Sequence, residues 1–498
     1  MSWVLALPLV IPFLTAVLAF LTRQSPLGRW ISVVGSAVLL AASIVLMNVV
    51  LRDGVIAGQM GGWSAPFGIT LVADLLSAVM VVITAIVALA VSIYAIADVD
   101  EGMERLGYHA LFNMLIAGVV GAFITGDLFN LYVWFEVMLI ASFGLLVLGG
   151  RPEQIDGGVK YVALNLVSTI MFLTGIGLLY GMTGTLNMAD LASAVDNADQ
   201  RILTLVAVLF MIAFGVKAAV FPLFFWLPAS YHTPAFAVSA VFAGLLTKVG
   251  VYALLRIFTL IFDHDTAFTH TILLWVAGLT MVVGVLGAAA QSDMRKILSF
   301  HIVSQIGYMI MGLALLTPLA IVGAVFYLVH HIVVKANLFL IAGVAQRIAG
   351  GTKLSRIGGL YKSAPLLAVL FVVPAFSLAG FPPLSGFWAK FLLVKAALDV
   401  QGWIIAGIAL VVGLLTIYSM TKIWAQAFWE PHPDGIEPKL SNLSSRNRAA
   451  MLVPISGLAA LTVIIGVMPE PFVRFAEASA AQLLDPTPYI EAVLGVQP

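Results

Sequence analysis

The sequence consists of long apolar runs separated by short polar connections, and this pattern constrains the fold more than any other feature. A helix needs about 20 mostly apolar residues to cross the hydrocarbon core of a bilayer. About 14 runs in this chain reach that length. They begin near Ser2, Trp30, Ile69, Tyr108, Phe129, Tyr161, Ile202, Phe236, His270, Ile297, Pro318, Pro365, Trp403 and Ala449. The sequence therefore predicts an all-α integral membrane protein with about 14 transmembrane helices.

The composition agrees with a membrane environment and argues against several functions. Hydrophobic residues make up 62% of the 498 positions and charged residues only 10%, with no formal net charge. A soluble domain carries roughly a quarter charged residues, so this chain is too poor in charge for water. A neutral chain does not indicate a nucleic-acid ligand. The absence of cysteine excludes disulfides, iron–sulfur clusters and thiolate metal sites.

The basic residues are distributed unevenly between the two sets of loops, and this predicts the orientation. Loops after even-numbered spans contain Arg52, Arg201 and Arg256, and the C-terminal tail contains Arg474. Loops after odd-numbered spans contain Arg23, Arg29, Arg105, Arg151, Lys160, Arg295, Lys296, Arg347, Lys353, Arg356, Lys362, Lys422, Lys439, Arg446 and Arg448. Because basic loops stay in the cytoplasm, both termini are predicted to face outward. In the tail, the amphipathic stretch 472–484 predicts an interfacial helix.

Two predicted spans are interrupted by proline. The seventh contains Lys217-Ala-Ala-Val-Phe-Pro222, and the twelfth contains Gly380-Phe-Pro-Pro-Leu-Ser-Gly386 with Pro374 upstream. Proline lacks a backbone donor and leaves the carbonyl four residues earlier without its helical partner. Broken helices at corresponding positions of two halves indicate a transport site near the middle of the membrane. The alternative is a pair of kinks that serve packing alone, since proline is common in membrane helices.

Five lysines fall inside the predicted spans: Lys217, Lys248, Lys335, Lys390 and Lys395. A charged side chain at the bilayer centre costs at least about 2.5–3.5 kcal/mol, so such positions are candidates for function. A buried ammonium can lose its proton near neutral pH, whereas a guanidinium stays charged. Lys395 lies near a helix end and can extend its ammonium to the interface. We therefore expect Lys390 to be the buried member of that pair.

Glu136 is the one acidic residue predicted at a similar depth, and Lys217 is its expected partner. The alternative role for such a pair is static, as an ion pair that fixes helix packing. One carboxylate cannot neutralise five lysines, so the other lysines are expected to be neutral part of the time or to lie in a hydrated channel. Both arrangements suit proton conduction.

Span eleven carries a stripe of titratable side chains. Tyr327, His331 and Lys335 are each four residues apart and therefore lie on one helical face, with His330 about 100° away from it. Such a stripe predicts a proton relay. The alternatives are a histidine pair bonded to the backbone and a metal site. No cluster with metal-ligand spacing appears elsewhere in the sequence, and the metal remains unassigned.

Sequence motifs for other chemistry are missing. The chain has no P-loop, which argues against ATP as the driving force, and no glycine-rich dinucleotide motif between a strand and a helix. No constellation of a nucleophile and a base emerges either. The sequence therefore predicts a transporter rather than an enzyme, with no cofactor. A scaffold that holds partners together without transport is the alternative from another class.

The motifs that carry a family resemblance are spread over nearly the whole chain. They read Thr125-Gly-Asp-Leu-Phe-Asn-Leu131, Phe135-Glu-Val-Met-Leu-Ile140, Thr185-Leu-Asn-Met-Ala-Asp190, Phe242-Ala-Gly-Leu-Leu-Thr-Lys-Val-Gly250, Phe262-Asp-His-Asp-Thr-Ala-Phe-Thr-His270, His330-His-Ile-Val-Val-Lys335 and Gly380-Phe-Pro-Pro-Leu-Ser-Gly-Phe-Trp-Ala-Lys390. On these motifs the sequence resembles the proton-translocating antiporter-like family, which includes membrane-arm subunits of complex I and Mrp-type multisubunit Na⁺/H⁺ antiporters. The resemblance implies that spans 4–8 and 9–13 form two inverted five-helix repeats, each with one broken helix. The chain then divides into an N-terminal segment (1–106), a first repeat (107–260), a second repeat (261–430) and a last span with a short tail (431–498).

The resemblance also implies the function. We expect a proton-translocating subunit of an antiporter that exchanges Na⁺ or another monovalent cation for protons across a bacterial cell membrane. Its partners would be membrane lipid and the other subunits of an Mrp-type complex. Together, the resemblance and the stripe on span eleven give the expected proton-translocating residues: Glu136, Lys217, Lys248, His330, His331, Lys335 and Lys390. The alternative is a proton-pumping subunit of complex I or of a membrane-bound hydrogenase.

Overall fold

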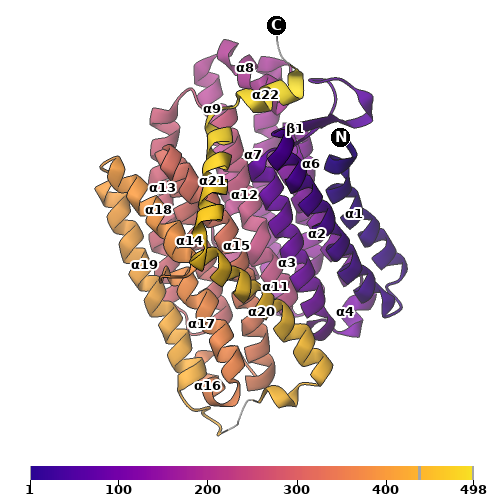
Figure 1. Ribbon diagram of the computed structural model, residues 1–498, viewed down its shortest axis with the longest axis vertical. Coiled ribbons are helices and arrows are strands. Elements are labelled where there is room, and N and C mark those ends of the chain that lie inside the picture. Colours follow the sequence, from indigo (N-terminus) through magenta and orange to yellow (C-terminus); the bar gives the residue numbers. More distant parts are fainter. Residues whose placement is uncertain (1, 436–438, 496–498) are drawn as a thin grey trace.

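The computed structural model describes residues 2–435 and 439–495 as a bundle of helices that run roughly side by side (Figure 1). In this part of the chain, 12 helices are long and apolar enough to cross a membrane. Two shorter apolar helices, α5 (Tyr108–Ile124) and α17 (Pro365–Ala379), fall on the predicted fourth and twelfth spans. The prediction of an all-α integral membrane fold is confirmed. The exact number of spans and the two inverted repeats remain predictions.

The N-terminal segment contains α1 (Ser2–Leu21), α2 (Leu27–Asp53), α3 (Leu75–Asp98) and the short α4 (Glu101–Arg105). A small hairpin that the sequence did not predict lies between α2 and α3. Its strands β1 (Ile56–Gln59) and β2 (Thr70–Ala73) pair antiparallel, with Ile56 opposite Ala73. The third span therefore begins at Leu75 and not near Ile69. The Asp74 carboxylate caps α3 by accepting a hydrogen bond of 2.8 Å from the backbone N–H of Ser77.

The remaining helices follow the predicted order of spans. The first half of the bundle continues with α5, α6 (Leu128–Val147), α7 (Pro152–Thr183), α8 (Met188–Ala194), α9 (Gln200–Ala218), α10 (Trp226–Ser230), α11 (Phe236–Val241), the π-helical segment η3 (Phe242–Leu246) and α12 (Thr247–Leu260). The second half contains α13 (Thr266–Ala290), α14 (Met294–Leu315), α15 (Pro318–Ala349), α16 (Leu360–Ser363), α17, α18 (Ser385–Asp399), α19 (Trp403–Ile423) and the π-helical segment η5 (Trp424–Trp429). The C-terminal segment contains α20 (Ser445–Val467), α21 (Pro469–Leu484) and α22 (Thr487–Leu494).

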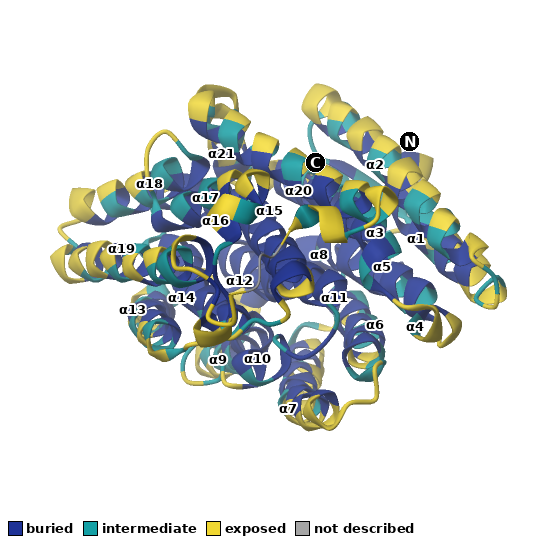
Figure 2. Ribbon diagram, turned by 90° about the horizontal axis from the view of Figure 1, so that it is seen from below, coloured by how far each residue is buried: buried dark blue, intermediate teal, exposed yellow. Residues whose placement is uncertain are grey.

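Burial is organised around α15, which packs against α14, α18 and α11. Figure 2 shows buried residues concentrated on α11, α12, α14 and α15, and exposed residues on the outer faces of α1, α2, α7 and α19. Many of the exposed side chains are large and apolar, such as Trp3, Leu18, Trp403 and Ile404. In a membrane protein these outer faces contact lipid rather than water. The most enclosed helices are therefore those that carry the predicted lysines and histidines of spans eight and eleven.

Both predicted interruptions are present. After α9, Ala219 adopts a left-handed conformation with φ 63°, and Pro222 follows before α10 begins. After α17, Gly380 adopts a left-handed conformation with φ 97°, and helix resumes only at Ser385. Each left-handed residue ends its helix, and the prolines cannot donate to the carbonyls of the preceding turn. Each break thus leaves helix-end carbonyls inside the bundle.

The tail after α20 differs from its prediction. Helix α21 covers the stretch expected to lie at the membrane interface, but it runs along the bundle and packs against α15, with further contacts to α3 and α12 (Figure 1). Its buried face consists of Ala476, Ser479, Ala480 and Leu483. The mostly small side chains on this face allow a close approach to α15. This amphipathic helix therefore presents its less polar face to protein.

Candidate functional site

The predicted lysines and histidines of spans eight and eleven lie in the centre of the bundle. Lys248, His331 and Lys335 have no exposed surface, and His330 is 1% exposed. Lys217 at the end of α9 is also buried, whereas Glu136 on α6 and Lys390 on α18 are half-buried. Lys395 is exposed, in agreement with the prediction that Lys390 is the buried member of that pair.

The ammonium groups of Lys248 and Lys335 are held by backbone carbonyls. Lys248 Nζ donates to the carbonyl of Ala243 in the π-helical segment η3, and Lys335 Nζ donates to the carbonyl of Leu298 on α14 at 3.0 Å. The two lysines lie within electrostatic reach of each other, and His331 lies within reach of both. Within the residues that the structure describes, neither lysine forms an ion pair with a carboxylate. A proton on one of these groups therefore disfavours a proton on the others.

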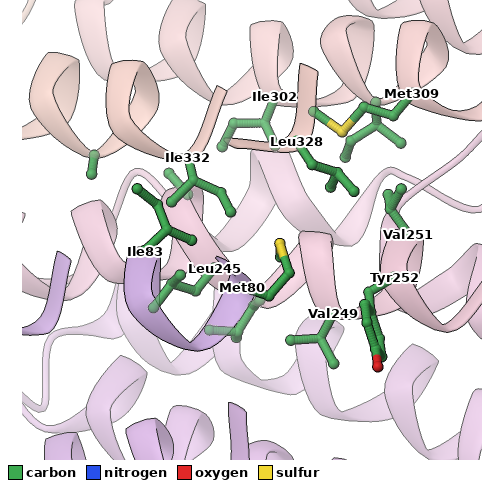
Figure 3. Close-up of a cluster of buried hydrophobic side chains, with 14 of the residues drawn as sticks. Met80, Ile83, Leu245, Val249, Val251, Tyr252, Ile302, Met309, Leu328 and Ile332 are labelled. Atoms are coloured by element: carbon green, nitrogen blue, oxygen red, sulfur yellow. The ribbon is translucent and has the colours of Figure 1, made fainter. Parts of the chain in front are cut away.

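The surroundings of this central group are apolar. Figure 3 shows a packed cluster of side chains from α3, η3, α12, α14 and α15. Val249 is the sequence neighbour of Lys248, and Ile332 is the sequence neighbour of His331. Electrostatic interactions are stronger in such a medium than in water. The central group is therefore strongly coupled without direct contact between its charged atoms.

At the first break, Lys217 Nζ lies 5.5 Å from the ring centroid of Phe135 and lines an enclosed cavity of about 20 Å³. Tyr161 and Asn165 from α7 also line this cavity, which is large enough for one water molecule. Glu136 lies within electrostatic reach of Lys217. Its carboxylate accepts a hydrogen bond of 2.6 Å from the Thr169 hydroxyl, and the direct Glu136–Lys217 ion pair expected from the sequence does not form in this conformation.

At the second break, Lys390 reaches from α18 back to the end of α17. Its Nζ donates a hydrogen bond of 3.0 Å to the carbonyl of Ala379 and lies 5.0 Å from the ring centroid of Tyr308. Tyr308 stacks on Tyr327 with centroids 5.3 Å apart, and the Tyr327 hydroxyl donates to Gln305 Oε1 at 2.5 Å. This chain of polar contacts links the broken helix to α14 and α15.

Two buried residues near the row were missed by the sequence reasoning. His301 on α14 and Asn337 on α15 have no exposed surface, and their side-chain nitrogen and oxygen atoms have no hydrogen-bond partner in the described part of the chain. His301 lies within electrostatic reach of Lys335 and Lys390. The signal was available, because His301 stands inside a predicted span and an ionisable residue there is a functional candidate by default.

One buried arginine also escaped prediction. Arg256 was assigned to an outer loop, but it lies inside α12 and forms a buried ion pair with Asp74 at the start of α3. Tyr489 from α22 packs beside it, with its ring centroid 5.1 Å from Arg256 Cζ. Asp127 caps α6 nearby by accepting a hydrogen bond of 2.7 Å from Asn130, and burial raises the pKa of this carboxyl. The aspartates at these helix starts thus serve capping and pairing.

A polar pocket of about 510 Å³ opens among the ends of α3, α7, α11, α14 and α15. Its lining includes Asp98, Asp100, Arg151, Arg295 and Arg347. Arg295 and Arg347 each donate to a backbone carbonyl at 2.5 Å. The pocket therefore presents charge of both signs close to the buried centre of the bundle.

A multi-pass helical bundle with an ionisable interior and two interrupted helices defines an integral membrane protein built to handle charge inside the bilayer. Residues 125–416 match the model of the NADH:quinone oxidoreductase/Mrp antiporter transmembrane family. The chain is 48% identical over 496 residues to a Na⁺/H⁺ antiporter subunit of Alkalihalophilus pseudofirmus, covering 99% of this chain and 100% of the relative. It is 42% identical over 490 residues to the antiporter subunit of the same name from Bacillus subtilis, covering 98% of each. The chain belongs to the NADH:quinone oxidoreductase/Mrp antiporter transmembrane family.

Solved structures of related complexes share the fold. A chain in the Mrp complex from Dietzia sp. DQ12-45-1b superposes with a TM-score of 0.91 at 35% identity, covering 99% of this chain and all of that chain. A chain of respiratory complex I from Thermus thermophilus superposes with a TM-score of 0.82 at 25% identity, covering 97% of this chain and all of that chain. The predicted family resemblance is therefore confirmed.

Proposed function

We propose that this chain is a proton-translocating subunit of a multisubunit Na⁺/H⁺ antiporter of the Mrp type in a bacterial plasma membrane. The observation that carries the proposal is the buried row of lysines and histidines in a chain that matches the antiporter relatives over their full length. Other subunits of the antiporter complex are its partners. The higher identity to the antiporter subunits than to the complex I chain supports this function over that of a complex I or hydrogenase subunit. The chain acts as part of a transporter and not as an enzyme.

Proton transfer in this proposal runs along the buried row. The residues that carry it are Glu136, Lys217, Lys248, His330, His331, Lys335 and Lys390, and His301 and Asn337 are added from their position. A proton that reaches Lys248 repels charge on its neighbours, including Lys217, and strengthens the attraction of Lys217 to Glu136. In the present conformation Thr169 holds the Glu136 carboxylate. Exchange of this hydrogen bond for a lysine contact is the local switch, and the differential affinity between its two states drives the transfer.

The orientation in the proposal follows the basic loops. Helices α4 and α16, which contain Arg105 and Lys362, lie at the opposite end of the bundle from α8 and α22 (Figure 1). Both marked termini lie toward the end that contains α8 and α22. The positive-inside rule then assigns the α4 and α16 end to the cytoplasm and both termini to the outside. The polar pocket around Arg295 would open to the cytoplasm.

The test is exchange by the assembled complex in membrane vesicles. Glu136→Ala and Lys217→Ala complexes are expected to assemble and to lose Na⁺/H⁺ exchange. Lys395→Ala is the matched control, because Lys395 is exposed and lies outside the row, and it should exchange at the rate of the unmodified complex. Full exchange by an assembled Lys217→Ala complex would sink the proposal.

A further inference from the structure

Two serine hydroxyls and one imidazole form a buried chain across the break between α17 and α18. Ser377 lies near the end of α17, and Ser385 is the first residue of α18. Their hydroxyl oxygens are 2.9 Å apart, and Ser385 Oγ is 2.8 Å from Nδ1 of His330 on α15. Neither serine has exposed surface. The hydrogen bonds of the chain must therefore be satisfied within the protein.

The direction of these hydrogen bonds follows from what each partner can donate. The backbone N–H of Gly386 donates to Ser377 Oγ at 3.1 Å, so this contact cannot take the hydroxyl proton of Ser377. Among the residues that the structure describes, the other partner of Ser377 Oγ is Ser385 Oγ. The Ser377 hydroxyl therefore donates to Ser385, which leaves the Ser385 hydroxyl to donate to His330 Nδ1. Every donor in this arrangement has an acceptor.

The reverse direction leaves a buried donor without a partner. If His330 Nδ1 carried the proton and donated to Ser385, the Ser385 hydroxyl would donate to Ser377. The Ser377 hydroxyl proton would then have no acceptor, and a buried unsatisfied donor is strongly disfavoured. His330 Nδ1 is therefore an acceptor, and the proton of the neutral ring lies on Nε2. His330 Nε2 has no hydrogen-bond partner in the described residues.

We propose that Ser377 and Ser385 are positioning residues that hold His330 as the Nε2–H tautomer. This inference rests on the proposed function only in assigning proton transfer to His330. The groups facing the ring are Lys390 from α18, within electrostatic reach, and Tyr327 and His331 from α15. The serine pair sets which nitrogen can give a proton to that row. It also ties the protonation of Nδ1 to the break in the helix, because a proton there reverses both serine bonds.

Gly386 allows the two halves of the broken helix to come close enough for this chain. A Cβ atom at Gly386 would lie 1.8 Å from the carbonyl oxygen of Ser377 and 3.0 Å from Cε1 of His330. The backbone of α18 therefore lies directly against the last turn of α17. With a side chain at this position, Ser385 and Ser377 would have to separate.

The experiment is ¹⁵N NMR of the assembled complex with labelled histidine, in which the His330 signals are assigned by their loss in His330→Asn. At a pH where the ring is neutral, Nε2 is expected to be protonated and Nδ1 bare. In Ser385→Ala the Nδ1–H tautomer should appear, and Ser385→Thr should restore the native pattern. Ser377→Ala frees the Ser385 hydroxyl to point either way, so both tautomers should be populated there too. A protonated Nδ1 in the unmodified complex, or an unchanged tautomer in both alanine variants, would overturn the proposal.

Exchange measurements separate this inference from the proposed function. Ser385→Ala should lower the rate of exchange about tenfold, as expected for the loss of one orienting hydrogen bond, and Ser385→Thr should recover it. Ser419→Ala is the matched control, because Ser419 is equally buried but its hydroxyl donates within its own helix to Leu415 at 3.0 Å. Full exchange by His330→Asn would overturn the transfer role of His330 and leave the tautomer assignment to the NMR result.

Discussion

Lys390 on α18 donates a hydrogen bond across the helix break to the carbonyl oxygen of Ala379, the last residue of α17, at 3.0 Å. The carbonyls at the C-terminal end of a helix carry partial negative charge. Lys390 is thus stabilised by a helix end and needs no carboxylate. The broken helix supplies the partner for its own lysine, and this relationship leads to the first prediction.

Lys390→Arg should keep the assembled complex but lower exchange by about 100-fold or more, the scale of a lost proton-transfer group. The guanidinium can bond to the same carbonyl, but it does not release its proton. Exchange in vesicles and native gels of the complex measure the two effects. Lys395→Arg is the control and should leave both unchanged, since that side chain is exposed. Exchange at the unmodified rate in Lys390→Arg would contradict a transfer role.

Asp74→Asn should destabilise the protein by about 3–5 kcal/mol, because it leaves the buried charge of Arg256 without its partner. Thermal unfolding of the complex in detergent measures the loss. The double variant Asp74→Asn with Arg256→Met removes both charges and should recover most of the stability. If the double variant is no more stable than the single one, the ion pair is not the cause.

Gly250→Ala should destabilise the contact between α12 and the end of α9 by about 1–3 kcal/mol. A Cβ at this position would lie 2.6 Å from the backbone nitrogen of Ala218 and 2.9 Å from the carbonyl carbon of Lys217. The lysine-bearing turn must therefore shift, and exchange should fall as well. Gly407→Ala on α19 is the matched control, because its Cβ meets nothing within 4 Å. An equal loss of stability in both variants would argue against close packing at Gly250.

Glu104 gives a prediction on pH. Burial alone would raise the pKa of this carboxyl, but hydrogen bonds from His109 and Arg29 outweigh it and hold the pKa below its usual value of 4.5. Because the folded pKa lies below the unfolded one, the stabilisation is present above about pH 4.5 and is lost as the pH falls through the folded pKa. Unfolding temperatures measured on either side of pH 4.5 should therefore drop less steeply with acid in Glu104→Gln. The same steepness in both proteins would remove Glu104 from the acid response.

His301→Phe should reduce exchange without preventing assembly, because it removes a titratable group within reach of Lys335 and Lys390. Phenylalanine fills the apolar surroundings and leaves no unsatisfied polar atom. Vesicle exchange and yield of the complex provide the readouts. If His301→Phe exchanges normally, His301 belongs to packing rather than to the row.

The sequence predicted the transmembrane helices well because a bilayer leaves few options for the backbone. Apolar runs located the spans, and Pro222 and Gly380 located the breaks. The hairpin before α3 escaped because its strands are short and stand in a loop. Arg256 escaped because it lies near a helix end, where an arginine and a loop residue look alike in sequence.

The contacts of the site were less predictable than its members. Lys248 and Lys335 stood out as charges in apolar runs, but their carbonyl partners are set by packing between helices far apart in the chain. The Glu136 carboxylate faced a choice between Lys217 and a neutral hydroxyl, and only the geometry of α7 placed Thr169 within reach. His301 needed no structure and only a consistent use of the rule for ionisable residues in membranes.

The apolar surroundings of Lys248 also bear on how the protein is made. The segment Phe236–Leu260 carries Lys248 and Arg256, yet its most apolar window has a mean hydropathy of 1.8. During synthesis this segment meets the insertion machinery before the α15 residues that later enclose Lys248 have been translated. Hydrophobic neighbours offset the insertion cost of a lone lysine. Val249, Val251 and the other side chains around it (Figure 3) can therefore bring the lysine into the bilayer first, and form the core around it only when the later helices arrive.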